Sequence, residues 1–244
     1  KEISPYRYVG VNFNSQGNPN LKPSDNYNLD LKWDFNPTPT ELISLTAFYK
    51  LIKNPISRIE VASAGGYLSY ENIADKATVA GVEIEIRKNL FVRPVSNAAH
   101  GMNKLSLGLN GSYIYTNAKM PLATVTTGSQ LEGAAPWIVN FDLSHNFTKG
   151  ERSFVNTLVL NYVSDKIYTI GTQGYQDIME QGVLTLDFVS QAKLNKHLSL
   201  NLKARNLLNP SYKLSRKANE NGEKVILNDY KKGINISLGV SCTF

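Results

Sequence analysis

The sequence predicts an all-β protein, a transmembrane antiparallel β-barrel segment of about nine strands. Three observations predict this fold. Apolar and polar residues alternate over segments of roughly ten residues, no segment has the period of an amphipathic helix, and short and long connections alternate. Because successive side chains of a strand point to opposite faces, each segment has one apolar and one polar face. Its length suits a tilted strand that crosses a bilayer.

The alternating segments follow one another along most of the chain. The expected strands, in order, are residues 27–35, 43–51, 82–87, 105–115, 139–147, 154–166, 184–188, 198–205 and 234–244. The sixth is the least regular, because both of its faces hold apolar residues. The last has an unbroken apolar face that lipid would cover, formed by Ile234, Ile236, Leu238, Val240, Cys242 and Phe244.

The connections orient the predicted sheet. The short ones are 36–41, 148–153 and 194–197, and the long ones are 53–77, 117–136, 167–182 and 208–229. Residues 89–104 are an exception, because they form a longer connection on the short side. Bacterial outer-membrane barrels have short periplasmic turns and long extracellular loops. We therefore expect residues 1–26 to be an extracellular loop, 27–244 to hold strands and loops, and Phe244 to lie at the periplasmic rim.

The aromatic residues are sorted in the same way, as interfacial girdles require. Those at expected periplasmic ends are Trp33, Phe35, Phe147 and Phe244. Those at expected extracellular ends are Tyr49, Tyr113, Tyr115, Trp137, Tyr162 and Tyr230. A soluble β-sandwich lectin, an alternative class for an all-β chain, has no reason to sort its aromatics along the strands.

The composition argues against several other functions. The net charge is +6, but no basic run exceeds about two residues, so we expect no nucleic-acid partner. Cys242 is the single cysteine, and His100, His145 and His197 lie far apart, which predicts no metal site and no cofactor. No catalytic motif is present, so an enzyme is not expected. A barrel lipase or protease would need a nucleophile and a histidine at one rim.

The odd strand number indicates a larger barrel. Single-chain bacterial barrels normally have an even number of strands, and an open sheet would leave two unpaired edges in lipid. We therefore interpret the chain as the C-terminal part of a larger barrel. A barrel closed by these strands alone is the weaker alternative.

Several motifs, in order along the chain, resemble those of TonB-dependent outer-membrane receptors, particularly of the Bacteroidetes type. They are Asn18-Pro19-Asn20-Leu21-Lys22-Pro23 with Asn26-Tyr27; Ala47-Phe48-Tyr49-Lys50 through Ile56; Tyr70-Glu71-Asn72 and Val79-Ala80-Gly81-Val82-Glu83; Ala134-Ala135-Pro136-Trp137 with Asn140; and Asn206-Leu207-Leu208-Asn209-Pro210 with Tyr212. The terminal strand resembles the C-terminal insertion signal of Gram-negative outer-membrane barrels, which Ile236, Leu238, Val240 and Phe244 would form.

The resemblance implies a 22-stranded barrel in the cell outer membrane, of which this chain supplies the C-terminal strands. It implies a plug domain and a TonB box upstream, both absent from this sequence. The implied partners are outer-membrane lipid, the rest of the barrel and its plug, TonB through the missing N-terminal part, and a surface lipoprotein. The implied function is TonB-dependent uptake of a nutrient. A non-transporting barrel that serves as a scaffold in an outer-membrane complex is the alternative.

Two groups of side chains are candidates for solute contact. The first is the set of charges expected to face the lumen: Asp30, Lys32, Asp34, Glu83, Glu85, Arg87, Asp142, Lys203 and Arg205. Their simpler role is to bond one another, water and the plug. The second is the set of loop aromatics Tyr67, Tyr70, Tyr168 and Tyr175, which would bind ligand or pack on one another.

Overall fold

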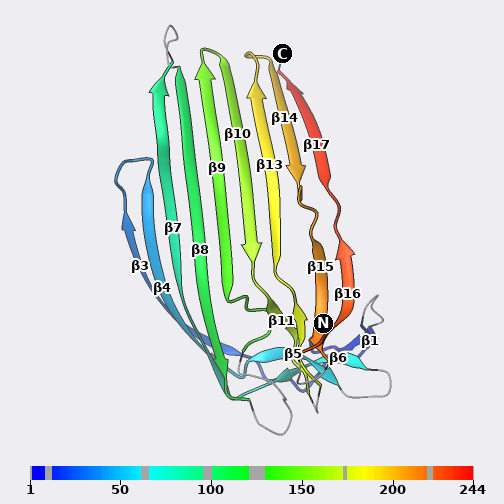
Figure 1. Ribbon diagram of the computed structural model, residues 1–244. Helices are drawn as coiled ribbons and strands as arrows, with labels where there is room; N and C mark the ends of the chain where they lie inside the picture. Colours follow the sequence, from blue (N-terminus) through cyan, green and yellow to red (C-terminus); the bar gives the residue numbers. More distant parts are fainter. Residues whose placement is uncertain are drawn as a thin grey trace.

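The computed structural model describes residues 2–8, 13–61, 66–95, 101–120, 130–172, 175–218 and 222–243. Its main feature is one antiparallel sheet of nine strands, a tall curved wall in Figure 1. From one edge to the other the strands are β17 (Asn235–Cys242), β14 (Leu198–Arg205), β13 (Val183–Lys193), β10 (Arg152–Val163), β9 (Trp137–Lys149), β8 (Met102–Ala118), β7 (Lys76–Pro94), β4 (Leu42–Lys53) and β3 (Asp25–Phe35). These are the nine predicted strands in the predicted order, so the all-β prediction is confirmed. In the described part of the chain no helix is long and apolar enough to cross a membrane.

Strand register aligns the apolar residues into one continuous face. Leu143 of β9 lies opposite Leu107 of β8 and Leu158 of β10. At the sheet edge, Leu202 of β14 lies opposite Leu238 of β17. This face is largely open, since 74% of Leu31 and 71% of Leu238 are exposed. A one-residue slip in any pair would move a whole apolar set to the other face, so the shared register indicates one environment for this face.

The opposite face is polar across the same strands. Glu83 lies opposite Thr46 and Ser112, and Lys203 lies opposite Ser237. Two ion pairs form among the charges predicted for this face: Lys32 Nζ is 3.2 Å from an Asp34 oxygen, and Arg87 Nη2 is 2.6 Å from a Glu85 oxygen. The charges predicted for the interior of a barrel therefore share one face of the sheet.

Gly81, within one of the family-like motifs, allows an aromatic side chain to lie on this polar face. A Cβ at residue 81 would overlap the ring of Phe48 and the carbonyl oxygen of Tyr113. Phe48 and Gly81 are paired residues of β4 and β7, so the missing side chain makes room for its neighbour. The glycine of the Val79–Glu83 motif thus has a packing reason.

Short and long connections alternate as predicted. Figure 1 shows the turns after β3, β7, β9 and β13 at one end together with the C-terminus, and the long connections at the other end. The prediction of a long connection at 89–104 is wrong, because β7 continues to Pro94 and β8 begins at Met102. A bulge between Asn89 and Phe91 interrupts the two-residue alternation there and hides the strand in the sequence.

Glu41 protects the exposed edge of β7 at the short-turn end. β4 ends its pairing at Leu42, opposite Arg87, so the next part of β7 has no strand partner on that side. The Asn89 amide donates to Glu41 Oε1 at 3.0 Å, and Lys88 Nζ lies 3.3 Å from the same oxygen. The Asn89 hydrogen bond is the largest cause that holds the pKa of Glu41 below its ordinary 4.5; with Lys88 it outweighs the opposing effect of burial.

The long connections contain strands of their own, and here the expectation of plain loops is wrong. One four-stranded sheet is formed by β1 (Arg7–Tyr8), β2 (Ser15–Gln16), β6 (Tyr67–Asn72) and β5 (Ile56–Val61). The other is formed by β11 (Lys166–Thr169), β12 (Ile178–Glu180), β15 (Ser211–Lys217) and β16 (Lys224–Lys231). The predicted sixth strand, 154–166, is also interrupted at Ser164–Asp165. β5, β6, β11 and β12 are buried or half-buried at nearly every residue, whereas β16 is mostly exposed.

The sheet is open in the part of the chain that the structure describes. β3 and β17 are its two edges, and each has one strand neighbour. β17 pairs with β14 from Asn235 to Cys242, as predicted for the terminal strand. An unpaired strand edge leaves backbone groups without partners, which a bilayer does not tolerate. An open sheet is the expected form for one part of a barrel wall.

Candidate functional site at the long-loop end

The long-loop end holds the buried apolar cluster of the described residues, here called the loop-end core. It contains Ile59, Ile73, Ala74, Ala77, Ala118, Leu131, Ile167 and Ile170. These residues come from β5, β7, β8, β11 and the connections between strands, so five separate chain segments meet there. The long connections therefore form a packed cap over one end of the sheet.

Main-chain hydrogen bonds fix β5 to the segment that follows β11. Ile59 and Ile170 form a parallel bridge. The Ile170 amide donates to the Arg58 carbonyl at 3.0 Å, and the Glu60 amide donates to the Ile170 carbonyl at 3.1 Å. Two connections more than a hundred residues apart in sequence are joined as in a sheet.

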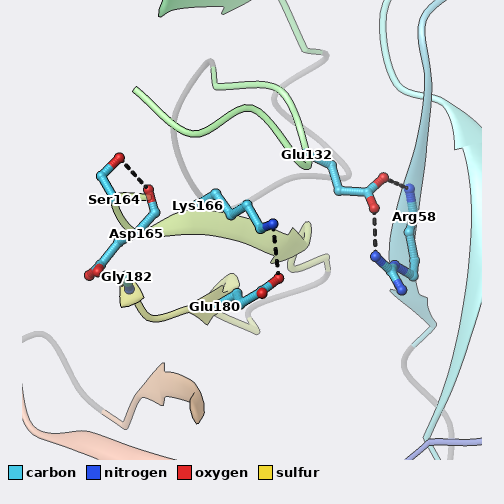
Figure 2. Close-up of polar contacts among 7 residues, drawn as sticks. All are labelled: Arg58, Glu132, Ser164, Asp165, Lys166, Glu180 and Gly182. Atoms are coloured by element: carbon cyan, nitrogen blue, oxygen red, sulfur yellow. Dashed lines mark hydrogen bonds and ion pairs between the residues drawn. The ribbon is translucent and has the colours of Figure 1, made fainter. Parts of the chain in front are cut away.

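Arg58 joins β5 to a third connection (Figure 2). Its amide donates to Glu132 Oε2 at 2.8 Å, and its Nη2 donates to Glu132 Oε1 at 2.7 Å. Its guanidinium also lies 4.0 Å from the centre of the Tyr168 ring. Because the Arg58 and Glu132 side chains are 24% and 20% exposed, water screens this pair only in part.

Arg216 forms the corresponding link to the other four-stranded sheet. Its Nη2 donates to Glu60 Oε2, and its guanidinium lies 5.3 Å from the Tyr175 ring centre. Thr172 Oγ1 donates to the Glu60 carbonyl. Lys166 and Glu180, paired residues of β11 and β12, form a further ion pair at 3.3 Å (Figure 2).

A cavity of about 290 Å³ lies between β12, β15 and β16, here called the polar-face cavity. It is lined by Asp165, Gln176, Asp177, Met179, Ser215, Arg216, Lys217 and Lys224. Met179 and Ser215 are paired in register, and Met179 packs on the loop-end core. Ala77 and Ala118 of that core lie on the polar face of β7 and β8, so the cavity opens on the polar side of the wall.

A second cavity, of about 130 Å³, lies on the other side of the same four strands. It is lined by Tyr168, Glu180, Tyr212, Lys213, Leu214, Asn228 and Tyr230. Tyr212 and Tyr230 are stacked with ring centres 5.5 Å apart, and Lys232 Nζ lies 3.8 Å from the Tyr212 ring centre. These rings continue the aromatic residues at the long-loop end, where Tyr113 and Trp137 lie 4.6 Å apart.

The structure separates the four predicted ligand-contact tyrosines. Tyr67 and Tyr70 lie on β6, and the Tyr70 carbonyl accepts a hydrogen bond from Asn18. Tyr168 packs against Arg58 and Phe13 beside the second cavity. Tyr175 is 42% exposed and lies next to Arg216, a lining residue of the polar-face cavity. Contact of these rings with a solute stays a prediction.

Sequence reasoning did not select Arg58, Glu60, Glu132 or Arg216, which form two ion pairs between separate connections at this end. Arg58 and Glu60 are two residues apart on one strand and so share a face, which is the only local signal. Their partners lie 74 and 156 residues away, and no spacing rule predicts such pairs.

The remaining predicted residues lie apart from this site. Ile236, Leu238 and Val240 are exposed on the apolar face of β17, while Phe244 lies outside the described residues. His145 contacts Asn103 at 2.8 Å, His197 contacts the Thr243 carbonyl at 2.7 Å, and His100 lies outside the described residues. Within the described ranges, no three or more His, Cys, Asp or Glu side chains are grouped so as to hold a metal ion.

Comparisons with known proteins gave one match. A family model described as TonB dependent receptor-like, beta-barrel matches residues 2–207. A search of curated proteins and a search of solved structures each found no match.

Proposed function

The chain belongs to the TonB-dependent receptor-like β-barrel family, and on that premise we propose that it forms barrel wall and extracellular loops of a receptor that imports a nutrient. The family is one of outer-membrane receptors and transporters, whose members are not enzymes. The observation that carries the proposal is the continuous apolar face, aligned in register across nine strands and backed by a charged face. Lipid would cover the first and the transport lumen would wet the second.

The proposed path of the solute passes the cap. The polar-face cavity is on the side that would face the lumen, and its ionisable lining consists of Asp165 and Asp177 against Arg216, Lys217 and Lys224. Mixed charges of this kind suit a polar solute. Among the predicted tyrosines, Tyr175 is the best placed for contact, because it adjoins this cavity. Tyr67, Tyr70 and Tyr168 complete the proposed set.

The proposal includes the partners that uptake requires. They are outer-membrane lipid around the apolar face, the remaining strands and plug of the receptor, and TonB acting through the N-terminal part. A surface lipoprotein over the extracellular loops is a further proposed partner. The open edges of β3 and β17 are where the remaining strands would pair.

The test compares growth of a strain lacking the gene with its parent on a panel of single nutrients, each measured with and without TonB. We expect both the receptor deletion and the TonB deletion to abolish growth on the same nutrient. The full-length receptor should restore growth of the receptor-deletion strain. Tyr175→Ala should raise the nutrient concentration that supports half-maximal growth, while Tyr230→Ala, on the other side of the wall, should not. Unchanged uptake together with dissociation of an outer-membrane complex would instead support the scaffold function.

A further inference from the structure

Four neighbouring strands of the wall are interrupted at one level, here called the seam. It consists of residues 164–165 between β10 and β11, 181–182 between β12 and β13, 206–210 between β14 and β15, and 232–234 between β16 and β17. Figure 1 shows β15 and β16 continuing β14 and β17 beyond this level. The sheet β11–β12–β15–β16 is therefore an extension of the wall, separated from the nine-stranded sheet by a transverse break.

Main-chain pairing stops at the seam and resumes beyond it. β14 and β17 pair up to Arg205 and Asn235, and β15 and β16 pair again from Ser211 and Lys231. β10 and β13 pair up to Val163 and Val183, and pairing resumes between Lys166 of β11 and Glu180 of β12. No continuous backbone ladder couples the two sheets across these four strands.

Side-chain bonds and a few single main-chain bonds replace the ladder. The Leu207 amide donates to the Leu186 carbonyl at 2.8 Å, and the Gln181 amide donates to the Lys213 carbonyl at 2.9 Å. Asp165 Oδ1 accepts from the Gly182 amide at 2.6 Å (Figure 2), and Asp187 Oδ1 accepts from the Asn206 amide at 2.8 Å. Asn206 Nδ2 donates to the Gly233 carbonyl at 2.7 Å. Asn209 Oδ1 accepts from the Gly233 amide at 3.0 Å. Each of these side-chain bonds depends on one residue, whereas a ladder distributes the coupling over many residues.

The backbone of the seam contains residues in the left-handed region. Asn206 and Asn209 have φ of 58° and 43°, in the left-handed region, and Gly233 has φ of 80°. Asn206 Oδ1 is buried without a hydrogen-bond partner. Left-handed residues and unpaired buried groups persist where the surroundings hold them, and they concentrate at segments that move.

Farther along the wall, β7 and β8 have no break toward the loop-end core, although residues 54–55 and 73–75 separate the β4–β7 pair from the β5–β6 pair. β7 and β8 run for 19 and 17 residues, directly into the loop-end core through Ala77 and Ala118. Their one irregularity, the bulge at Asn89–Phe91, lies at the opposite end. The cap is therefore connected to the nine-stranded sheet by the continuous strands β7 and β8 on one side and by the interrupted strands of the seam on the other.

We propose that the seam is a hinge, about which the sheet β11–β12–β15–β16 tilts as one body relative to the nine-stranded sheet. The Arg216–Glu60 ion pair and the Ile59–Ile170 bridge hold the position seen here, because they tie the jointed sheet to β5. Tilting moves the polar-face cavity, most of whose lining belongs to this sheet, relative to β5 and the loop-end core. The hinge does not depend on the proposed transport function.

The test is hydrogen exchange of the full-length receptor in lipid nanodiscs, followed by mass spectrometry. Asn209→Gly keeps the left-handed backbone but removes the bond to Gly233, and Glu60→Gln weakens the tie to β5. Each change should raise exchange of the seam amides of Gly182 and Asn206, by roughly tenfold for the loss of a charge-assisted bond in Glu60→Gln. Amides bonded within β11, β12, β15 and β16 should keep their protection, because the sheet tilts as one body. β13, β14 and β17 should keep their parental rates.

Asn54→Gly is the matched control, because Asn54 is also left-handed (φ 48°) but lies between β4 and β5, away from the seam. It should leave the seam amides unchanged. The hinge is disproved if the Gly182 and Asn206 amides do not respond, or if β11, β12, β15 and β16 lose protection throughout, because the sheet would then unfold and not tilt. If Asn209→Gly does not fold, Glu60→Gln decides, since Glu60 lies outside the seam.

Discussion

The nine-stranded sheet and the loop-end core keep apolar side chains from water in opposite ways. In the sheet, Leu31 and Leu238 are more than 70% exposed within the chain, and their cover must come from outside. In the loop-end core, Ile170 is 1% exposed and is covered by other connections of the same chain. One region is folded for lipid and the other is folded like a small soluble domain.

The difference explains why the two regions have different sequence patterns. A sheet between two environments needs one type of residue on each face, so its strands alternate strictly. In the cap, the apolar residues of β5, β11 and the connections follow the packing of several segments in the loop-end core. The comparison can be tested by shortening a buried side chain of the loop-end core and by placing a charge on the apolar face of the sheet.

The largest expected effect is in the loop-end core. Ile170→Ala should destabilise the cap by about 2–5 kcal/mol, because a buried branched side chain is removed from a site formed by five segments. Native-state hydrogen exchange of the full-length receptor should show the loss in β5, β6 and β11, with little change in β9 and β10. Ile226→Ala, at a position 47% exposed, is the control and should have a much smaller effect.

A charge on the apolar face should have the next largest effect. Leu143→Arg places a cation near the middle of β9, between Leu107 and Leu158, and should cost about 2–4 kcal/mol in a bilayer. Urea unfolding from lipid vesicles measures this loss. Ser144→Arg, one residue along on the polar face, should be nearly neutral. Equal losses from the two variants would contradict the assignment of the faces.

The sequence was sufficient for the membrane sheet and insufficient for the cap, for physical reasons. Alternation is local, so the nine strands and their faces could be predicted residue by residue. It failed at Asn89–Phe91, where a bulge moves the positions on the apolar face from even to odd residue numbers. It could not predict the Arg58–Glu132 pair, since the partners are 74 residues apart and nothing nearby marks them. Asn206 and Asn209 stand out in the sequence as part of a motif. Their hydrogen bonds to Gly233 could not be predicted, because they depend on how the strands pair.

An intermediate effect is expected for the ion pair that joins β5 to residue 132. Glu132→Gln keeps the shape but removes the charge, and should destabilise the cap by about 1.5–3 kcal/mol, the range for hydrogen bonds to charged groups. A double-mutant cycle with Arg58→Met isolates the pair energy. A coupling near zero would mean that packing alone holds the connections together.

The smallest expected effect is at the short-turn end and depends on pH. The pKa of Glu41 is lower in the folded protein, so its carboxylate stabilises the fold fully above the ordinary value of 4.5. That contribution is lost as the pH falls through the lowered pKa, when the protonated acid no longer accepts well from Asn89 or pairs with Lys88. Glu41→Gln should therefore be less stable than the parent at pH 7, and the difference should shrink toward pH 3 in urea unfolding. Because Glu41 covers the edge of β7 where β4 ends, a constant difference would assign its role to shape rather than charge.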